Sequence, residues 1–126
     1  MHAISTPNAP TPAGHYSQAM VHNGLVFVAG QLPIMPGSTS REVGSIEEQT
    51  RQVLANIRAV LEASGSALDR LLQVTVYVTD MALWGRFNTV YAEVMGDHKP
   101  ARAVVPVNPL HHGYSVEVQA IAAVRE

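Results

Sequence analysis

The chain has 126 residues and a mass of 13.5 kDa, which corresponds to a single domain over residues 1–126 because domains cluster at roughly 100–150 residues. It contains no cysteine, so disulfides, thiolate zinc sites and cysteine nucleophiles are excluded. No stretch approaches the ~18 apolar residues of a membrane span, and the N-terminus lacks the pattern of a secretory signal. We therefore expect a cytoplasmic protein with no membrane partner.

The charge balance excludes a second class of partner. Eight Lys and Arg residues stand against ten Asp and Glu residues, and the isoelectric point is near 6.3. Nucleic-acid binders need clustered basic residues to neutralise phosphates, so we expect no nucleic-acid partner. Only 14% of the residues are charged, against about 25% in a typical soluble domain. This scarcity favours a homo-oligomer that buries neutral surface between its copies.

The first third of the chain predicts an extended segment, a hairpin and a loop. Residues 1–13 are rich in proline and should run extended. Residues 16–21 and 25–30 each predict a strand, and the Asn23-Gly24 pair between them is typical of a tight hairpin turn. Residues 33–44 hold two prolines and two glycines and predict a loop.

A first helix is predicted to follow this loop. Residues 45–48 read Ser-Ile-Glu-Glu, which fits the capping box that opens helices. Gly65 is a plausible stop. Between them, residues that recur at helical spacing predict the buried face: Ile46, Thr50, Val53, Leu54, Ile57, Val60 and Leu61.

The second half predicts a strand, a second helix and two more strands. Residues 71–79 are apolar on both faces, which indicates a central strand. Asp80 can cap the second helix and Pro100 ends it, while 102–107 and 114–124 predict strands. One side of that helix should carry Leu83, Trp84, Phe87, Val90, Tyr91 and Val94. This order predicts an α+β domain with two helices on one face of a mixed sheet, whose other face needs a second subunit to cover it.

Glu117 is the first candidate for chemistry. Strand alternation places it with Gln119, Ile121 and Ala123, opposite an apolar row in the last strand. A carboxylate in an apolar strand is costly unless it is paired or solvated. It either lies at a wet edge or sits in a half-buried cleft, where its pKa could suit a general base.

Arg102 is the second candidate, because it opens a strand directly after a prolyl turn at Pro100. Its guanidinium could bind a substrate carboxylate through two parallel hydrogen bonds. The alternative is an ordinary surface arginine.

Other site classes find no support in the sequence. Six histidines are present, but no pair has the i, i+4 spacing of a helical zinc site, and we expect no metal. Glycine-rich phosphate loops are also missing. Trp84 and Phe87 lie at helical spacing and are expected in the core.

Several motifs spread along the chain resemble the RidA/YjgF family. They are Gly14-His15-Tyr16-Ser17-Gln18-Ala19, Val28-Ala29-Gly30-Gln31-Leu32-Pro33, Glu48-Gln49-Thr50 with Asn56-Ile57, 75–81, Phe87-Asn88 with Val90-Tyr91, Pro100-Ala101-Arg102 and 116–122. The resemblance implies a chorismate-mutase-like fold and a homotrimer whose sheets form an inner barrel, with clefts between subunits. It also implies cofactor-independent hydrolysis of small imines and enamines, of the 2-aminoacrylate or 2-iminopropionate type, to 2-keto acid and ammonia.

The resemblance also implies roles for particular residues. Arg102 matches the arginine that binds the substrate carboxylate, and Glu117 matches the acid that positions and activates water. Tyr16 matches a tyrosine that lines the cleft, while Gly30 and Asn88 match positions near it. Such an enzyme needs only to orient water and manage protons, because the C=N carbon is already electrophilic.

This chain departs from the family pattern at the substrate-binding positions. Ala29 stands where the family has serine, and His15 stands where it usually has proline. Residues 105–114 are also unusual, so we expect His15, His111 and Tyr114 to act in specificity.

Four functions are therefore open. The first is hydrolysis of small 2-imino acids, and the second is a related catabolic deamination of a larger substrate. The third is a trimeric binding or regulatory protein without catalysis, which Ala29 would permit. The fourth, RNA cleavage or inhibition of translation, is disfavoured by the acidic isoelectric point.

Overall fold

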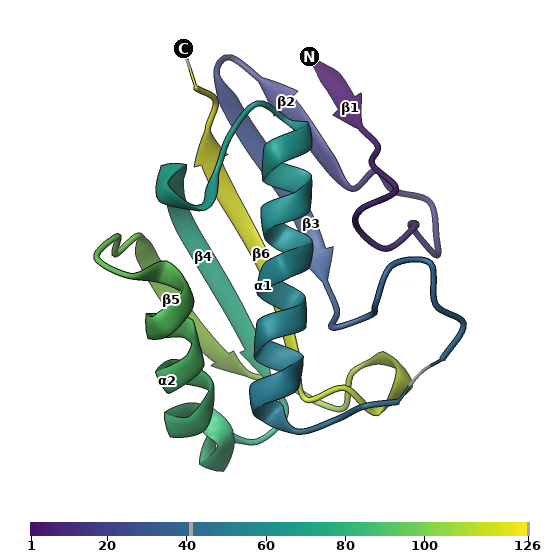
Figure 1. Ribbon diagram of the computed structural model, residues 1–126, viewed down its shortest axis with the longest axis vertical. Helices are drawn as coiled ribbons and strands as arrows, with labels where there is room; N and C mark the ends of the chain where they lie inside the picture. The colour runs from purple at the N-terminus through teal and green to yellow at the C-terminus, as the bar shows by residue number, and fades with distance from the viewer. Residues whose placement is uncertain (41, 126) are drawn as a thin grey trace.

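The computed structural model describes residues 1–40 and 42–125, and it places two α-helices across one face of a single sheet (Figure 1). The strands are β1 (His2–Ile4), β2 (Ala19–His22), β3 (Leu25–Gln31), β4 (Leu71–Val78), β5 (Ala101–Pro106) and β6 (Val116–Ala123). The helices are α1 (Ile46–Ala63) and α2 (Trp84–Met95), with short 3₁₀ turns η1 (Leu68–Arg70), η2 (Met81–Leu83) and η3 (His111–Gly113).

The sheet is mixed, as predicted. Its strand order is β1-β2-β3-β6-β4-β5, and the β4–β5 pair is parallel whereas the other neighbours are antiparallel. The Asn23-Gly24 turn joins β2 to β3 with both residues at positive φ, 51° and 77°. That geometry is the one the hairpin signal requires. Strand β4 has a neighbour on each side, which confirms the prediction of a central strand.

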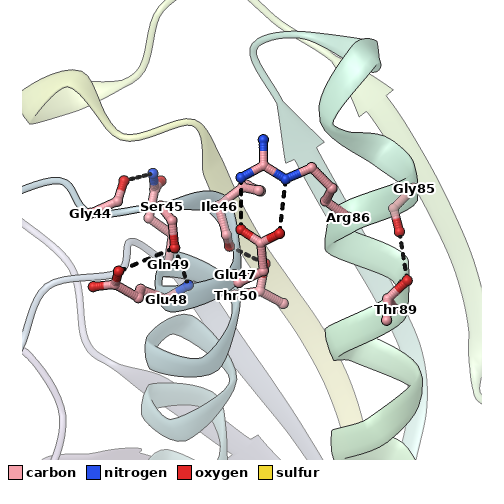
Figure 2. Close-up of polar contacts among 10 residues, drawn as sticks. All are labelled: Gly44, Ser45, Ile46, Glu47, Glu48, Gln49, Thr50, Gly85, Arg86 and Thr89. Atoms are coloured by element: carbon pink, nitrogen blue, oxygen red, sulfur yellow. Dashed lines mark hydrogen bonds and ion pairs between the residues drawn. The ribbon is translucent and has the colours of Figure 1, made fainter.

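Helix α1 begins and ends where the sequence indicates. The Ser45 hydroxyl accepts a hydrogen bond from the Glu48 backbone N–H at 3.1 Å (Figure 2). The chain leaves the helix through Gly65 at φ 77°. All seven residues predicted for the inner face are buried: Ile46, Thr50, Val53, Leu54, Ile57, Val60 and Leu61.

Helix α2 is joined to α1 by an ion pair between their N-terminal turns. Arg86 donates to both Glu47 carboxylate oxygens, each at 2.8 Å (Figure 2). Asp80 caps η2 rather than α2 itself, because its carboxylate accepts from the Ala82 N–H at 2.9 Å. The prediction for Val94 was wrong: it is 38% exposed, and Met95 is buried in the last turn instead.

The N-terminal predictions need two corrections. Residues 2–4 form β1, which pairs with β2, although only an extended segment was predicted there. The next strand begins at Ala19 and not at residue 16. The amide of Gln18 explains the delay, since its side chain is buried and bonds the backbone of the preceding loop. A third correction concerns the last strand. It was predicted to begin at residue 114 but begins at Val116, because the η3 turn comes shortly before it.

The face of the sheet that packs on the helices is buried, and the opposite face is open. Val116, Val118, Ala120 and Ala122 of β6 are buried, while Glu117, Gln119, Ile121 and Ala123 point to the open face, as the alternation predicted. Exposed apolar side chains on that face include Phe27 at 43% and Leu72 at 49%. Neither helix of the described ranges is long and apolar enough to cross a membrane.

Candidate active site

Glu117 lies on β6 at the floor of a cavity of about 440 Å³, which we call the Glu117 cavity. Its walls come from the N-terminal segment, the end of β3, the following loop and η3. They are formed by Pro10, Thr11, Ala13, Gly14, Tyr16, Ala29, Gly30, Gln31, Leu32, Ile34, His111 and His112. The cavity therefore combines one carboxylate and two imidazoles with a largely apolar wall.

Gly30 is the residue that lets the carboxylate lie where it does. The β3–β6 register shifts between Val28 and Gln31, so the β3 backbone bends beside Glu117. A Cβ atom on Gly30 would lie 3.2 Å from the Glu117 carboxyl carbon and would overlap its Oε2. Only glycine accommodates this approach.

The surroundings of Glu117 favour a base that holds its proton more tightly than usual. Burial raises the pKa of the Glu117 carboxyl above its ordinary value, and the nearby His111 charge opposes that shift. A carboxylate with a raised pKa is a stronger base towards water.

Buried amides hold the walls of the cavity. Gln18 donates to the carbonyls of Thr6 and Pro10 at 3.0 Å each and so fixes the N-terminal wall. Asn56 of α1 donates to the carbonyls of Leu32 and Ile34 at 2.9 Å each. Both amides are 1–2% exposed, and their loss would leave partly buried carbonyls without these donors.

A third amide ties the segment before β6 to α1. Gln49 donates to the Gly44 carbonyl at 3.1 Å and accepts from the Ser115 N–H at 2.8 Å (the first bond is drawn in Figure 2). Helix α1 is thus the common support for both the loop after β3 and the end of the η3 turn.

Arg102 belongs to the other side of the sheet. It pairs in register with Val74, whose side chain faces the helices, and it contacts α2. Its Cζ lies 4.7 Å from the Trp84 ring centroid and 4.6 Å from that of Tyr91. Its Nη1 donates to Asn88 Oδ1 at 3.0 Å. These contacts hold the guanidinium, which has five N–H donors, against α2 at the edge of a cavity.

The cavity beside Arg102, which we call the Arg102 cavity, is basic. It has a volume of about 360 Å³, and the described residues of its lining include Asn88, Tyr91, His98, Lys99 and Arg102 but no carboxylate. Burial raises the pKa of the Tyr91 hydroxyl, and the Arg102 charge opposes that shift. Among the described residues no carboxylate forms an ion pair with Arg102. The cavity is therefore suited to an anion.

The structure brings together some of the predicted site residues and separates others. Tyr16, Ala29, Gly30, His111 and Glu117 share the Glu117 cavity. Arg102 and Asn88 instead meet at the Arg102 cavity, across the sheet.

Two residues expected to act in specificity line neither cavity. His15 is exposed and does not line the Glu117 cavity. Tyr114 is 2% exposed and lines a neighbouring hollow with the first turns of α1.

The sequence analysis missed the aromatic contacts of Arg102. Trp84 was expected in the core, yet it is only partly buried and packs on the guanidinium. The available signal was the i, i+4, i+7 spacing of Trp84, Asn88 and Tyr91, which places all three on one helix face. Within residues 1–40 and 42–125, no group of three His, Cys, Asp or Glu side chains could hold a metal ion.

Comparison with known proteins identifies the fold. Residues 6–124 match the family described as Endoribonuclease L-PSP. The RutC family protein PH0854 of Pyrococcus horikoshii is 48% identical over 119 residues, 94% of each chain. The structure of E. coli TdcF with bound serine has a TM-score of 0.93 at 29% identity, and the match covers 99% of this chain and 100% of that one. The YjgF gene product of E. coli gives the same TM-score and coverage at 30% identity.

The six-stranded mixed sheet with two helices on one face defines a small α+β protein of the type found in these relatives. The chain belongs to the Endoribonuclease L-PSP family, the RidA/YjgF family whose motifs the sequence carries.

Proposed function

We propose that this protein hydrolyses reactive 2-imino and enamine acids, of the 2-aminoacrylate or 2-iminopropionate type, to 2-keto acid and ammonia. The observation that carries the proposal is an arginine held between two aromatic rings without an ion-pair partner among the described residues, in one cavity, and a half-buried carboxylate in another. The guanidinium of Arg102 binds the substrate carboxylate, and Glu117 activates water. A cytoplasmic location, without cofactor, belongs to the same proposal.

The chemistry needs one base at the water. Glu117 accepts a proton from water as the oxygen bonds to the imine carbon. The C=N π electrons move to nitrogen, which takes up a proton from an acid. The resulting carbinolamine collapses when the proton held by Glu117 returns to nitrogen and ammonia leaves, while the hydroxyl proton passes to the conjugate base of that acid. The carboxylate clamp and the positioned water convert this into an intramolecular reaction.

The opposite placement of Arg102 and Glu117 supports a site shared between subunits. Arg102 faces α2, whereas Glu117 faces the open side of the sheet, so one chain does not offer both to a small substrate. We propose a homotrimer in which the open sheet faces form an inner barrel. Arg102 of one copy and Glu117 of the next would then meet in a cleft. The exposed Phe27 and Leu72 give those faces apolar surface to bury.

A coupled assay tests the proposal. An amino-acid oxidase generates imines from a range of amino acids, and semicarbazide traps whatever survives. We expect the protein to reduce the trapped imine, Arg102→Ala to abolish this effect, and Glu117→Gln to slow it severely. Turnover that survives Arg102→Ala would contradict the carboxylate clamp.

Mixing the two inactive variants tests the shared site. After dissociation and reassembly together, Arg102→Ala and Glu117→Gln subunits should regain part of the activity, because some clefts then carry both native residues. Each variant reassembled alone is the control. Light scattering checks the trimer independently. No recovery, in assemblies shown to be mixed, would place both residues in a site formed within one chain.

Binding without catalysis is the second candidate, because the TdcF structure contains bound serine and Ala29 replaces the family serine here. Stabilisation by a keto acid, with no ammonia release from any imine, would favour it. The size of accepted imines in the same panel separates the small-substrate enzyme from one with a larger substrate. The relatives' endoribonuclease label is tested by incubation with single-stranded RNA at low salt.

A further inference from the structure

Two adjacent histidines stand in the wall of the Glu117 cavity, immediately before β6. His111 and His112 open the η3 turn, and both line the cavity that holds Glu117. Their rings lie 5.9 Å apart, and the His112 ring meets Tyr114 edge-on at 6.2 Å. In the described part of the chain, no side-chain hydrogen bond occupies either imidazole.

The backbone here adopts a conformation that costs energy. His112 has φ 61° and Gly113 has φ 78°, so two successive residues are left-handed. A non-glycine residue in this region is uncommon and is held there by its surroundings. Here a bond from the Tyr114 N–H to the His111 carbonyl at 3.3 Å closes the turn. This turn carries both histidine side chains that line the cavity.

Among the described residues, four titratable side chains line the Glu117 cavity. The N-terminal segment contributes Tyr16, η3 contributes His111 and His112, and β6 contributes Glu117. The lining residues that the structure describes from strand β3 and the loop after it are neutral. Among the described basic groups, His111 is the one whose charge acts on Glu117. His112 instead packs towards Tyr114, which lines the neighbouring hollow.

We propose that His111 is a second proton-transfer residue of this site, which gives a proton to the imine nitrogen while Glu117 takes one from the attacking water. This inference rests on the proposed imine hydrolysis and names the acid that its mechanism requires. An imidazole is suited to the task because it exchanges its proton near neutral pH. The carboxylate and the imidazolium then divide the two proton transfers of each step.

The proton balance closes over the cycle. In the addition step, an O–H bond of water breaks towards Glu117, the C–O bond forms, and the imine nitrogen takes the imidazolium proton of His111. In the collapse step, the protonated Glu117 returns its proton to nitrogen as the C–N bond breaks. The hydroxyl proton passes to neutral His111 as the carbonyl forms. Both residues regain their starting states, and water plus imine become keto acid plus ammonia.

The test compares the pH dependence of His111→Gln with that of the native protein. General acid catalysis contributes about 10²–10⁴-fold, so we expect kcat to fall by about 10²-fold with little change in KM. In the native protein kcat should decline at alkaline pH, because a general acid must carry the proton that it donates. This decline should vanish in His111→Gln and persist in His112→Asn, since asparagine tolerates the left-handed backbone. The exposed His22→Gln serves as the control with native activity.

A measurement without substrate separates this inference from the proposed function. Carboxyl ¹³C NMR should show that the pKa of Glu117 rises further in His111→Gln, because the opposing charge of His111 is removed. The pKa of Glu117 should not change in His22→Gln. A native alkaline decline that survives in His111→Gln would overturn the proposal. Native protein that hydrolyses no imine would instead overturn the proposed function.

Discussion

Gly30→Ala is the substitution for which the structure makes the sharpest prediction. The added methyl carbon would overlap Glu117 Oε2 and lie 3.2 Å from the carboxyl carbon. The obstructing atoms are the end of a side chain at a cavity, so the carboxylate can rotate away without moving β3. The substitution should therefore disturb the site much more than the fold.

The magnitude follows from that overlap. Restoring ordinary contact requires the carboxylate to retreat on the order of 1 Å, and a displacement of that size costs about 10²-fold in rate. The cost to folding should stay at or below the low end of the about 1–3 kcal/mol typical of overpacking, because the cavity absorbs the shift. The imine-trapping assay measures the first quantity and urea unfolding the second.

Gly85→Ala is the matched control. An added Cβ there meets nothing within 4 Å, and Gly85 lies in α2, where alanine is favoured by about 1 kcal/mol. We expect native activity and equal or higher stability. Full activity in Gly30→Ala would refute the argument that the Glu117 carboxylate must lie against the β3 backbone.

The remaining predictions concern the supports of the site. Trp84→Leu should raise KM about tenfold and preserve kcat, because Arg102 loses its cation–π contact with the ring. Trp84→Phe should keep most of the affinity, and an unchanged KM in Trp84→Leu would contradict a role of the ring in holding Arg102. Asn56→Ala should cost about 1–3 kcal/mol in urea unfolding, because two partly buried carbonyls lose their donors. The hydrogen bond from Arg86 lowers the pKa of Glu47 to about 2, so its stabilisation is present above the ordinary value of 4.5 and is lost as pH falls towards 2; Glu47→Gln should lack this loss. Burial raises the pKa of Glu117, so its charge opposes folding at neutral pH and Glu117→Gln should raise the melting temperature there.

Much of the fold could be predicted from local patterns. The Ser45 cap, the Asn23-Gly24 turn and the alternation in β6 each reflect interactions among neighbours in sequence. The failures at residues 2–4 and 16–18 have a long-range cause. There the strand pairing and the Gln18 hydrogen bonds depend on which segments the fold brings together.

The site was harder to predict than the fold for a geometric reason. Sequence reasoning selected Arg102 and Glu117 as candidates, and each of them lines a cavity, but which side of the sheet each one faces depends on how β5 and β6 pair with β4. The steric role of Gly30 similarly depends on the register shift in β3. The contacts of Arg102 with Trp84 and Tyr91 could be predicted only once the position of α2 was known, because aromatic residues at helical spacing usually belong to the core.

The buried amides of α1 separate the chemistry of the cavity from the architecture that supports it. Gln49 and Asn56 form hydrogen bonds with backbone groups of the loop after β3 and of the segment before β6. These hydrogen bonds do not involve the side chains of the two segments. Mutations in the η3 turn or the loop after β3 can therefore change which molecules fit without weakening the scaffold. Selection could retune this cavity one wall at a time, and so could a laboratory library restricted to Leu32, Ile34 and His112, which line it.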